Sequence, residues 1–518
     1  MSIPALESSS RTLKNPQAGA RTAECWLASV LSALLLWASF PPWQVSYVAW
    51  VALIPWAWAV QSSRNLWVAM TCGFVSGFVF TALEFDWLRT SYTGSPLVKF
   101  GPYAAAWILF VVCCGLVQAC GSCGLALLLR RGHRFSFALP LAWTAHEQLL
   151  DVILRSFSGV PSESHQLAVS QANFLPWLQL GSLGGTIAIG WIVAVINGFA
   201  LDLVPPTPRV SKIAVAQILF ATIYGLTQMS VSYERGPRIL VRPELRFDSS
   251  LIARESDARR STGEDRVDLI IWPELAIDRD ASSPEVIAQL HQTAQIVQAP
   301  ILVGAYRLQP QPVQLRNSVV LAAPGQNSVT FSDKRFLTPS PFEWHRETPP
   351  ASPATEVMRH VPGESELFPS TEPPRIFEIG EDEDAPSWRF AVGICFDMSF
   401  TEWPREVLRS PTPPDFLVHC ASELLDRTGR AQSLSLISCQ LRCVETGRSM
   451  IRCVHFGHST AIDPAGRIGR LRPPEEWSQS FVSELPLGTK QTVYSKAGQW
   501  CVAIFVLVFL LVGLYRGS

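Results

Sequence analysis

The chain has 518 residues, of which 48% are hydrophobic and only 16% carry a charge. Ordinary soluble domains carry about 25% charged residues, so the composition argues against a fully water-soluble enzyme. The 42 basic and 43 acidic residues give a net charge of −1 without any basic cluster, which argues against a nucleic-acid partner.

Charged residues are unevenly distributed along the chain, and this distribution predicts the domain boundaries. Up to residue 231 charges are sparse and apolar runs are long, whereas residues 233–495 carry Arg, Asp and Glu at ordinary density. Another uncharged run covers residues 500–514. We therefore expect a membrane bundle over 1–231, a water-facing domain over 232–496 and a C-terminal transmembrane anchor over 497–518.

Apolar segments in the chain predict about eight membrane spans, seven of them before residue 231. A spanning helix needs about 20 mostly apolar residues. The candidate segments are 25–40, 45–60, 66–85, 103–129, 135–150, 178–201, 213–230 and 500–514. The first two are short and are separated by Pro41 and Pro42, while His146 and Glu147 interrupt the fifth.

The positions of Lys and Arg in the short loops predict the orientation of the bundle. With the N-terminus inside, the inner segments hold Arg11, Lys14, Arg21, Arg64, Arg130, Arg131, Arg134, Arg209, Lys212 and Arg516, and the outer loops hold Arg89, Lys99 and Arg155. This bias places the water-facing domain outside the cytoplasm. The N-terminal polar stretch is too long for the start of a cleaved signal peptide, and no small-residue cleavage site follows a short apolar core.

The water-facing domain has the pattern of an α/β fold. Short runs rich in β-branched residues predict strands at 238–242, 267–272, 300–306, 317–322, 390–395, 415–420, 450–455 and 461–463. Longer patterns predict helices at 283–297 and 432–446. Residues 348–386 are rich in Pro and acidic residues and have no periodicity, which is typical of a long functional loop.

Three short segments of this domain present chemically reactive side chains; the first and third lie at the ends of predicted strands, and the second precedes the Pro-rich stretch. Trp-Pro-Glu at 272–274 presents Glu274, Ser-Asp-Lys-Arg at 332–335 presents Lys334, and Gly-Ile-Cys-Phe-Asp at 393–397 presents Cys395. Lys334 is the only lysine between residues 213 and 489, in a chain that has six Lys against 36 Arg. A compact ammonium group is therefore expected to be required at this position.

The cysteines outside the predicted spans are expected to be packing residues or the nucleophile. They are Cys395, Cys420, Cys439, Cys443 and Cys453, and an odd number leaves at least one thiol outside any disulfide. Cys439 and Cys443 are spaced i, i+4 on a predicted helix, where packing is the expected role. We expect no metal and no organic cofactor.

Glu274, Lys334 and Cys395, with their flanking motifs, resemble the catalytic set of the carbon-nitrogen hydrolase, or nitrilase, superfamily. The segments 442–448 and 457–468 are similar to that superfamily's helix and closing hairpin. This resemblance implies an αββα sandwich. Because the domain is inserted before the last of eight spans, the whole chain resembles the membrane-embedded apolipoprotein N-acyltransferase family; the glycine-rich segments 73–77 and 180–185 and the run 191–197 support this.

The resemblance implies a function and a set of roles. The expected reaction transfers an acyl chain from the sn-1 position of a glycerophospholipid to the N-terminal amine of diacylglyceryl-cysteine in apolipoproteins, through a thioester on Cys395. Glu274 is the expected base, and Lys334 with the backbone N–H of Phe396 the oxyanion donors. Expected supporting residues are Glu343, Phe396 and Asp397, and expected substrate-binding residues are Trp87, Phe342 and Trp344. The expected location is the bacterial cytoplasmic membrane, with the catalytic domain on its outer face.

Two segments depart from the family pattern. Residues 159–162 read Gly-Val-Pro-Ser where the family has Gly-Phe-Pro-Trp, and residues 421–425 read Ala-Ser-Glu-Leu-Leu where it commonly has Asn-Asp-x-Trp-Phe. These departures bear on lipid access and acceptor preference rather than on the chemistry.

Three alternatives stay open at this stage. The first is a membrane-tethered nitrilase-type amidase that acts on a small amide with the same triad. The second is a Cys-His hydrolase, with a base chosen from His345, His360, His419, His455 and His458. The third is a membrane scaffold or transporter with a degenerate domain.

Overall fold

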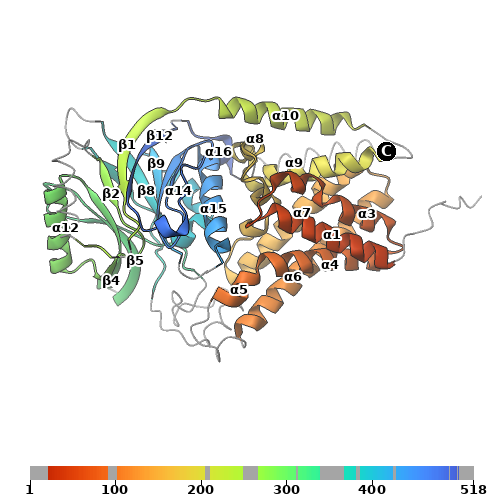
Figure 1. Ribbon diagram of the computed structural model, residues 1–518, viewed down its shortest axis with the longest axis horizontal. Coiled ribbons are helices and arrows are strands. Elements are labelled where there is room, and N and C mark those ends of the chain that lie inside the picture. The colour runs from red at the N-terminus through yellow and green to blue at the C-terminus, as the bar shows by residue number, and fades with distance from the viewer. Residues whose placement is uncertain are drawn as a thin grey trace, which may run out of the picture.

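A computed structural model describes residues 22–91, 102–204, 210–244, 246–248, 267–310, 313–338, 367–380, 386–423, 428–488, 490–498 and 500. A helical N-terminal half is followed by two β-sheets with their own helices (Figure 1). The helices of the N-terminal half are α1 (Thr22–Ser39), η1 (Ser46–Val48), α2 (Ala49–Ala52), α3 (Ile54–Ser62), α4 (Leu66–Glu84), α5 (Asp86–Ser91), α6 (Pro102–Arg130), α7 (Phe135–Ser158), η2 (Glu163–His165), η3 (Leu167–Gln171), α8 (Leu175–Leu178), α9 (Gly181–Asp202) and α10 (Lys212–Met229).

Four helices in the described part of the chain are long and apolar enough to cross a membrane. They are α1, α4, the stretch Trp107–Arg130 of α6, and α9. The predicted segments 135–150 and 213–230 form helices α7 and α10. The segment predicted at 45–60 is divided into η1, α2 and α3, because Pro55 in the first turn of α3 cannot continue the preceding helix. The predicted anchor lies outside the described residues from residue 501 onward.

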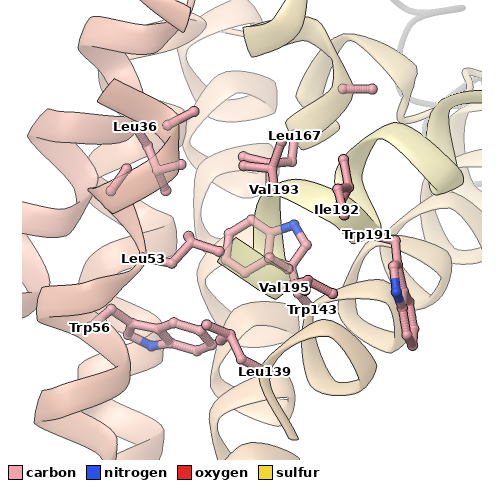
Figure 2. Packing of buried hydrophobic residues seen from close by; sticks show 14 of the residues in the cluster. Leu36, Leu53, Trp56, Leu139, Trp143, Leu167, Trp191, Ile192, Val193 and Val195 are labelled. Atoms are coloured by element: carbon pink, nitrogen blue, oxygen red, sulfur yellow. The ribbon is translucent and has the colours of Figure 1, made fainter. Parts of the chain in front are cut away.

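Large apolar side chains fill the centre of the helical half. Trp56 of α3 packs edge-on against Trp143 of α7, with ring centroids 5.7 Å apart (Figure 2). The Trp56 indole also donates a hydrogen bond to Ser122 Oγ at 3.0 Å, so its one polar atom is satisfied. The same apolar core extends to Leu434, Ile437, Leu441 and Val444 of α15 (Arg430–Thr446), so the bundle and the α/β domain share one core.

The α/β domain contains two mixed sheets. The first has the order β12-β1-β2-β4-β5-β6, with β3 paired to β4, and the second has the order β11-β10-β9-β8-β7. The strands are β1 (Glu234–Val241), β2 (Leu269–Ile271), β3 (Ile277–Asp280), β4 (Ile301–Pro310), β5 (Val313–Ala322), β6 (Thr330–Asp333), β7 (Ile376–Ile379), β8 (Trp388–Ile394), β9 (Phe416–Ser422), β10 (Ser449–His455), β11 (Ala461–Ile462) and β12 (Phe481–Leu487). All eight strands and both helices predicted from the sequence are present.

Three apolar layers show that the domain is an αββα sandwich. The middle layer lies between the sheets and joins residues such as Ile239 and Leu269 to Phe390 and Val418. The outer face of the first sheet packs against α12 (Pro284–Val297), and the outer face of the second packs against α14 (Glu402–Leu408) and α15. In Figure 1, α12 lies at the end of the molecule far from the bundle, and α15 lies beside the bundle. The predicted sandwich is therefore confirmed.

Buried polar contacts also join the bundle to the domain. Gln440 Nε2 on α15 donates to the carbonyl oxygen of Ala172 at 3.0 Å, and Gln179 Nε2 donates to that of Ala465 at 2.7 Å. Because buried amide groups lose their bonds to water, these contacts favour one docked arrangement. α15 thus lies between the second sheet and the bundle.

Candidate active site

Glu274 is a buried carboxylate just beyond the end of β2. Oε1 accepts hydrogen bonds from Lys334 Nζ at 3.0 Å and Asn317 Nδ2 at 2.7 Å, and Oε2 accepts one from the backbone N–H of Ser422 at 2.9 Å. Gly304 on β4 makes room for this turn, since a Cβ there would lie 2.6 Å from the Cα of Glu274. Both oxygens of the carboxylate are thus held by donors from three different elements.

Lys334 follows β6 and is fully buried, with 0% of its surface exposed. Its backbone N–H donates to the carbonyl oxygen of Asn317 at 2.8 Å, which extends the pairing of β5 and β6 by one residue. Its ammonium group forms the ion pair with Glu274. Lys334 is thus a buried lysine paired with a carboxylate and not a solvated surface lysine.

Cys395 is the first residue of η4 (Cys395–Ser399), directly after β8. Its φ of 49° lies in the left-handed region, which an L residue other than glycine seldom adopts. The side chain is half-buried. This sharp turn from strand to helix ends the ladder of β8 and turns the chain at the thiol, and such local strain is often kept at functional sites.

The Asp397 carboxylate connects the residues that follow Lys334 to the turn at Cys395. Oδ1 accepts from the backbone N–H groups of Arg335 at 3.1 Å and Phe336 at 2.8 Å, and Oδ2 accepts from that of Ile394 at 3.0 Å. Burial raises the pKa of Asp397 to about 7, while these donors and the nearby Lys334 act in the opposite direction. The two residues after Lys334 and the residue before Cys395 are thereby held by one carboxylate.

The pairing of β8 with β9 brings the third candidate to the same place. Ile394 lies opposite Cys420, so Cys395 is at the end of β8 beside the end of β9, whose Ser422 contacts Glu274. The structure therefore gathers Glu274, Lys334 and Cys395 at one edge of the sandwich. An acid-base group, a cation and a thiol in this arrangement can support nucleophilic acyl transfer. Among the described residues, no group of three or more His, Cys, Asp or Glu could hold a metal ion.

Comparison with known proteins shows what the chain is similar to. Residues 32–199 match the Apolipoprotein N-acyltransferase N-terminal domain. An apolipoprotein N-acyltransferase from Geobacter metallireducens is 25% identical over 95% of this chain and 96% of its own length, and one from Gloeobacter violaceus is 25% identical over 95% and 94%. Over nearly its whole length, the chain is similar to apolipoprotein N-acyltransferases. A CN-hydrolase superfamily protein from Xanthomonas campestris is 16% identical, over 53% of this chain and 97% of that one, with a TM-score of 0.34.

The remaining candidate residues of this apolipoprotein N-acyltransferase homologue are placed as follows. The Phe396 ring packs edge-on against Phe400, 5.4 Å between centroids. Trp87 is on α5 of the bundle, where its ring lies 6.5 Å from that of Phe85. Three other candidates lie outside the described residues: Phe342, Glu343 and Trp344.

Two contributors to this candidate site were not predicted from the sequence. Asn317 is one; as an amide placed shortly before the apolar run 319–322 of β5, it was a usable signal. The other is the backbone of Ser422, inside the segment 421–425 that departs from the family pattern. A backbone donor carries no signature in the sequence, so only the fold could reveal it.

The histidines proposed as alternative bases have other contacts. His419 is buried, and its Nε2 lies 3.0 Å from the carbonyl oxygen of Cys395. His455 Nδ1 faces the carbonyl oxygen of Pro243 at 3.3 Å, and the His458 ring packs edge-on against Trp477 at 5.4 Å. Two more, His345 and His360, lie outside the described residues. These geometries favour Glu274 as the base.

Proposed function

We propose that this enzyme transfers an acyl chain from the sn-1 position of a glycerophospholipid to the N-terminal amine of diacylglyceryl-cysteine in apolipoproteins. The observation that carries the proposal is the buried Glu274–Lys334 pair, 3.0 Å between Nζ and Oε1, at the sheet edge where Cys395 turns out of β8. The similarity of nearly the whole chain to apolipoprotein N-acyltransferases supports it.

The first half-reaction acylates Cys395. Glu274 takes the thiol proton, and the sulfur attacks the sn-1 carbonyl carbon to form a tetrahedral intermediate. Lys334 and the backbone N–H of Phe396 stabilise its oxyanion, a contribution typically worth about 3 to 4 kcal/mol per donor. The bond to the glycerol oxygen then breaks, and this oxygen takes the proton from Glu274. Lysophospholipid leaves, and a thioester remains on the enzyme.

The second half-reaction regenerates the thiol. The amine of diacylglyceryl-cysteine attacks the thioester carbonyl, and Glu274 accepts a proton from the attacking nitrogen. The carbon-sulfur bond breaks as the amide forms, and the proton passes to the departing sulfur. Because both substrates use one site in turn, the kinetics are ping-pong.

The apolar half gives this chemistry access to lipids. Each methylene of an acyl chain buried in a membrane contributes about 0.8 kcal/mol, so a soluble enzyme would have to extract both substrates. We propose a membrane bundle over 1–231 with about seven spans, a catalytic domain over 232–496 and an anchor over 497–518. The excess of Lys and Arg in the predicted inner loops supports a domain on the outer face of the bacterial cytoplasmic membrane.

A transfer assay tests the reaction. The full-length protein in detergent is mixed with a glycerophospholipid labelled in its sn-1 chain and a synthetic diacylglyceryl-cysteine peptide. We expect the label on the peptide amine with wild type and none with Cys395→Ala. Hydrolysis of small amides without any transfer to the peptide would favour the amidase alternative instead.

Cysteine labelling in whole cells tests the orientation. Val313 is 72% exposed in the α/β domain and Val210 is 62% exposed in a predicted inner loop, so each can accept a cysteine without loss of packing. We expect a membrane-impermeant maleimide to label Val313→Cys above the parent protein and to leave Val210→Cys at the parent's level. The reverse pattern would contradict the proposed orientation.

A further inference from the structure

A buried chain of side chains lies behind the cysteine turn. His419 on β9 faces the carbonyl oxygen of Cys395 through Nε2 at 3.0 Å and the Cys439 sulfur on α15 through Nδ1 at 3.4 Å. Arg452 Nη1 on β10 lies 2.9 Å from the same sulfur. His419, Cys439 and Arg452 each have 0% of their surface exposed. The carbonyl group of Cys395 is thus in hydrogen-bond contact with a buried side chain of β9 and not only with residues of its own turn.

The contacts determine where the protons lie. A carbonyl oxygen can only accept, so Nε2 of His419 carries hydrogen and donates to Cys395. Burial lowers the pKa of His419 well below its ordinary value, and the charges of Arg452 and Lys334 act in the same direction, so the ring is neutral. Nδ1 must then accept, and the Cys439 thiol donates to it while Arg452 donates to the sulfur.

The planar peptide bond between Cys395 and Phe396 links the His419 contact to the orientation of the Phe396 N–H. In a trans peptide the C=O of one residue and the N–H of the next point in opposite directions within one plane. A donor that fixes the Cys395 carbonyl therefore also fixes the direction of the Phe396 N–H. Cys395 has a φ of 49°, in the left-handed region, so neighbouring contacts are needed to hold its turn.

We propose that His419 is a positioning residue that orients the Phe396 N–H as an oxyanion donor, with Cys439 holding the required tautomer. This inference rests on the proposed acylation of Cys395. Hydrogen bonding at the carbonyl also polarises the peptide group, which makes its N–H a stronger donor. The segment carrying His419 leads directly into residues 421–425, where the chain departs from the family pattern.

Two reactions of Cys395 distinguish a positioning role of His419 from a general loss of active-site structure. Acylation by phospholipid passes through an oxyanion, whereas alkylation by iodoacetamide forms a carbon-sulfur bond and expels iodide without one. Both need loss of the thiol proton. We expect His419→Leu to lower the acylation rate, followed by intact mass, by about 10- to 100-fold, while alkylation changes less than about twofold.

A conservative replacement provides the rescue. His419→Gln retains an N–H near the position of Nε2, and we expect it to recover most of the acylation rate. Equal losses in acylation and alkylation for His419→Leu, or an unchanged acylation rate, would overturn the proposal. A wild-type enzyme that is alkylated but never acylated would instead overturn the proposed function, which keeps the two failures distinct.

A second pair of variants decides the question if His419→Leu does not fold. Cys439→Ala removes the donor to Nδ1 and allows the other tautomer, so acylation is expected to fall several-fold at unchanged alkylation. Cys439→Ser keeps a donor and is expected to stay near wild type. Cys443→Ala is the matched control, because Cys443 is an equally buried thiol one helical turn further along α15. Equal acylation in Cys439→Ala and Cys443→Ala would refute the role of Cys439.

Discussion

Lys334 Nζ lies 3.0 Å from Glu274 Oε1, and both side chains are buried, with 0% and 3% of their surfaces exposed. A buried ion pair of this kind is weak evidence for stability, because desolvation offsets much of the attraction. The pair lies near the carboxyl ends of the strands, where Cys395 also lies. Its presence there is better explained by chemistry, since one partner can accept a proton and the other can face a developing negative charge.

Replacing Lys334 tests this explanation. Lys334→Met leaves the Glu274 carboxylate buried without its cation, which typically costs about 3 to 5 kcal/mol of stability. Lys334→Arg keeps the positive charge but requires space for a larger, planar guanidinium group at a fully buried position. We expect both variants to lower the rate of acyl-enzyme formation at least about 100-fold. Lys490→Met, at an exposed lysine, is the control and should match wild type; near-normal acylation in Lys334→Arg would contradict the account.

Asn317 holds Glu274 through a hydrogen bond of 2.7 Å. A hydrogen bond to a charged group contributes about 1.5 to 3 kcal/mol, so Asn317→Ala is expected to lower kcat/KM by about 10- to 100-fold. Asn317→Asp should be worse, because it places a second carboxylate against Glu274. Steady-state transfer assays measure both. Activity in Asn317→Asp equal to or above that of Asn317→Ala would show that Asn317 does not act on the Glu274 carboxylate.

A buried cluster at the domain interface predicts the pH dependence of stability. Arg442 lies 2.6 Å from Glu163 Oε2 and 2.9 Å from Glu445 Oε2. Burial raises the pKa of Glu445 to about 8, with Arg442 opposing this and Glu163 adding to it. The unfolded chain releases this proton near pH 4.5, so the folded state holds more protons between about pH 4.5 and 8. The free energy of unfolding therefore falls as pH rises through this window.

Thermal unfolding in detergent at several pH values measures this effect. We expect the apparent Tm of wild type to fall from about pH 5 to pH 8, and Glu445→Gln to make this slope smaller, with buried Asp397 contributing part of what remains. Glu484→Gln, at a partly exposed carboxylate, should keep the wild-type slope. A slope in Glu445→Gln that equals the wild-type slope would assign the pH dependence to other groups.

Gly185 forms the break in α9 where the α/β domain docks. Its φ of 62° and ψ of −156° suit only glycine, and a Cβ there would lie 2.6 Å from the Tyr494 ring. We expect Gly185→Ala to lower stability by about 1 to 3 kcal/mol, measured as a lower Tm. Gly124→Ala in α6 is the matched control, because its Cβ would meet nothing within 4 Å. Equal Tm values for the two variants would mean that this contact does not hold the domain.

The sequence predicted the elements whose patterns are strong and local. The buried strands around Ile270, Val392 and Val418 are short apolar runs, and α15 has a full helical pattern, so their identities followed directly. β7 was missed, because only four residues pair within a stretch that otherwise lacks periodicity. β12 was missed because Pro486 is unusual in a strand; here β12 is at the edge of its sheet, where proline is tolerated.

The candidate site was predictable where residue chemistry was unusual for its setting. Glu274 after a buried strand, the isolated Lys334 and Cys395 at a strand end each departed from the surrounding composition. The contacts that hold them were not predictable, because they depend on which strand ends meet. Two contacts have no sequence signature because they involve main-chain atoms. They are the hydrogen bonds that Asp397 accepts from backbone N–H groups and the contact of His419 with the Cys395 carbonyl.

Intact mass of the purified full-length enzyme after incubation with a glycerophospholipid tests the central claim most directly. We expect a fatty-acyl mass increment on wild type that is absent from Cys395→Ala and is discharged by a diacylglyceryl-cysteine peptide. An increment that persists in Cys395→Ala, or a wild-type enzyme that acylates the peptide without ever carrying the increment, would contradict a thioester on Cys395.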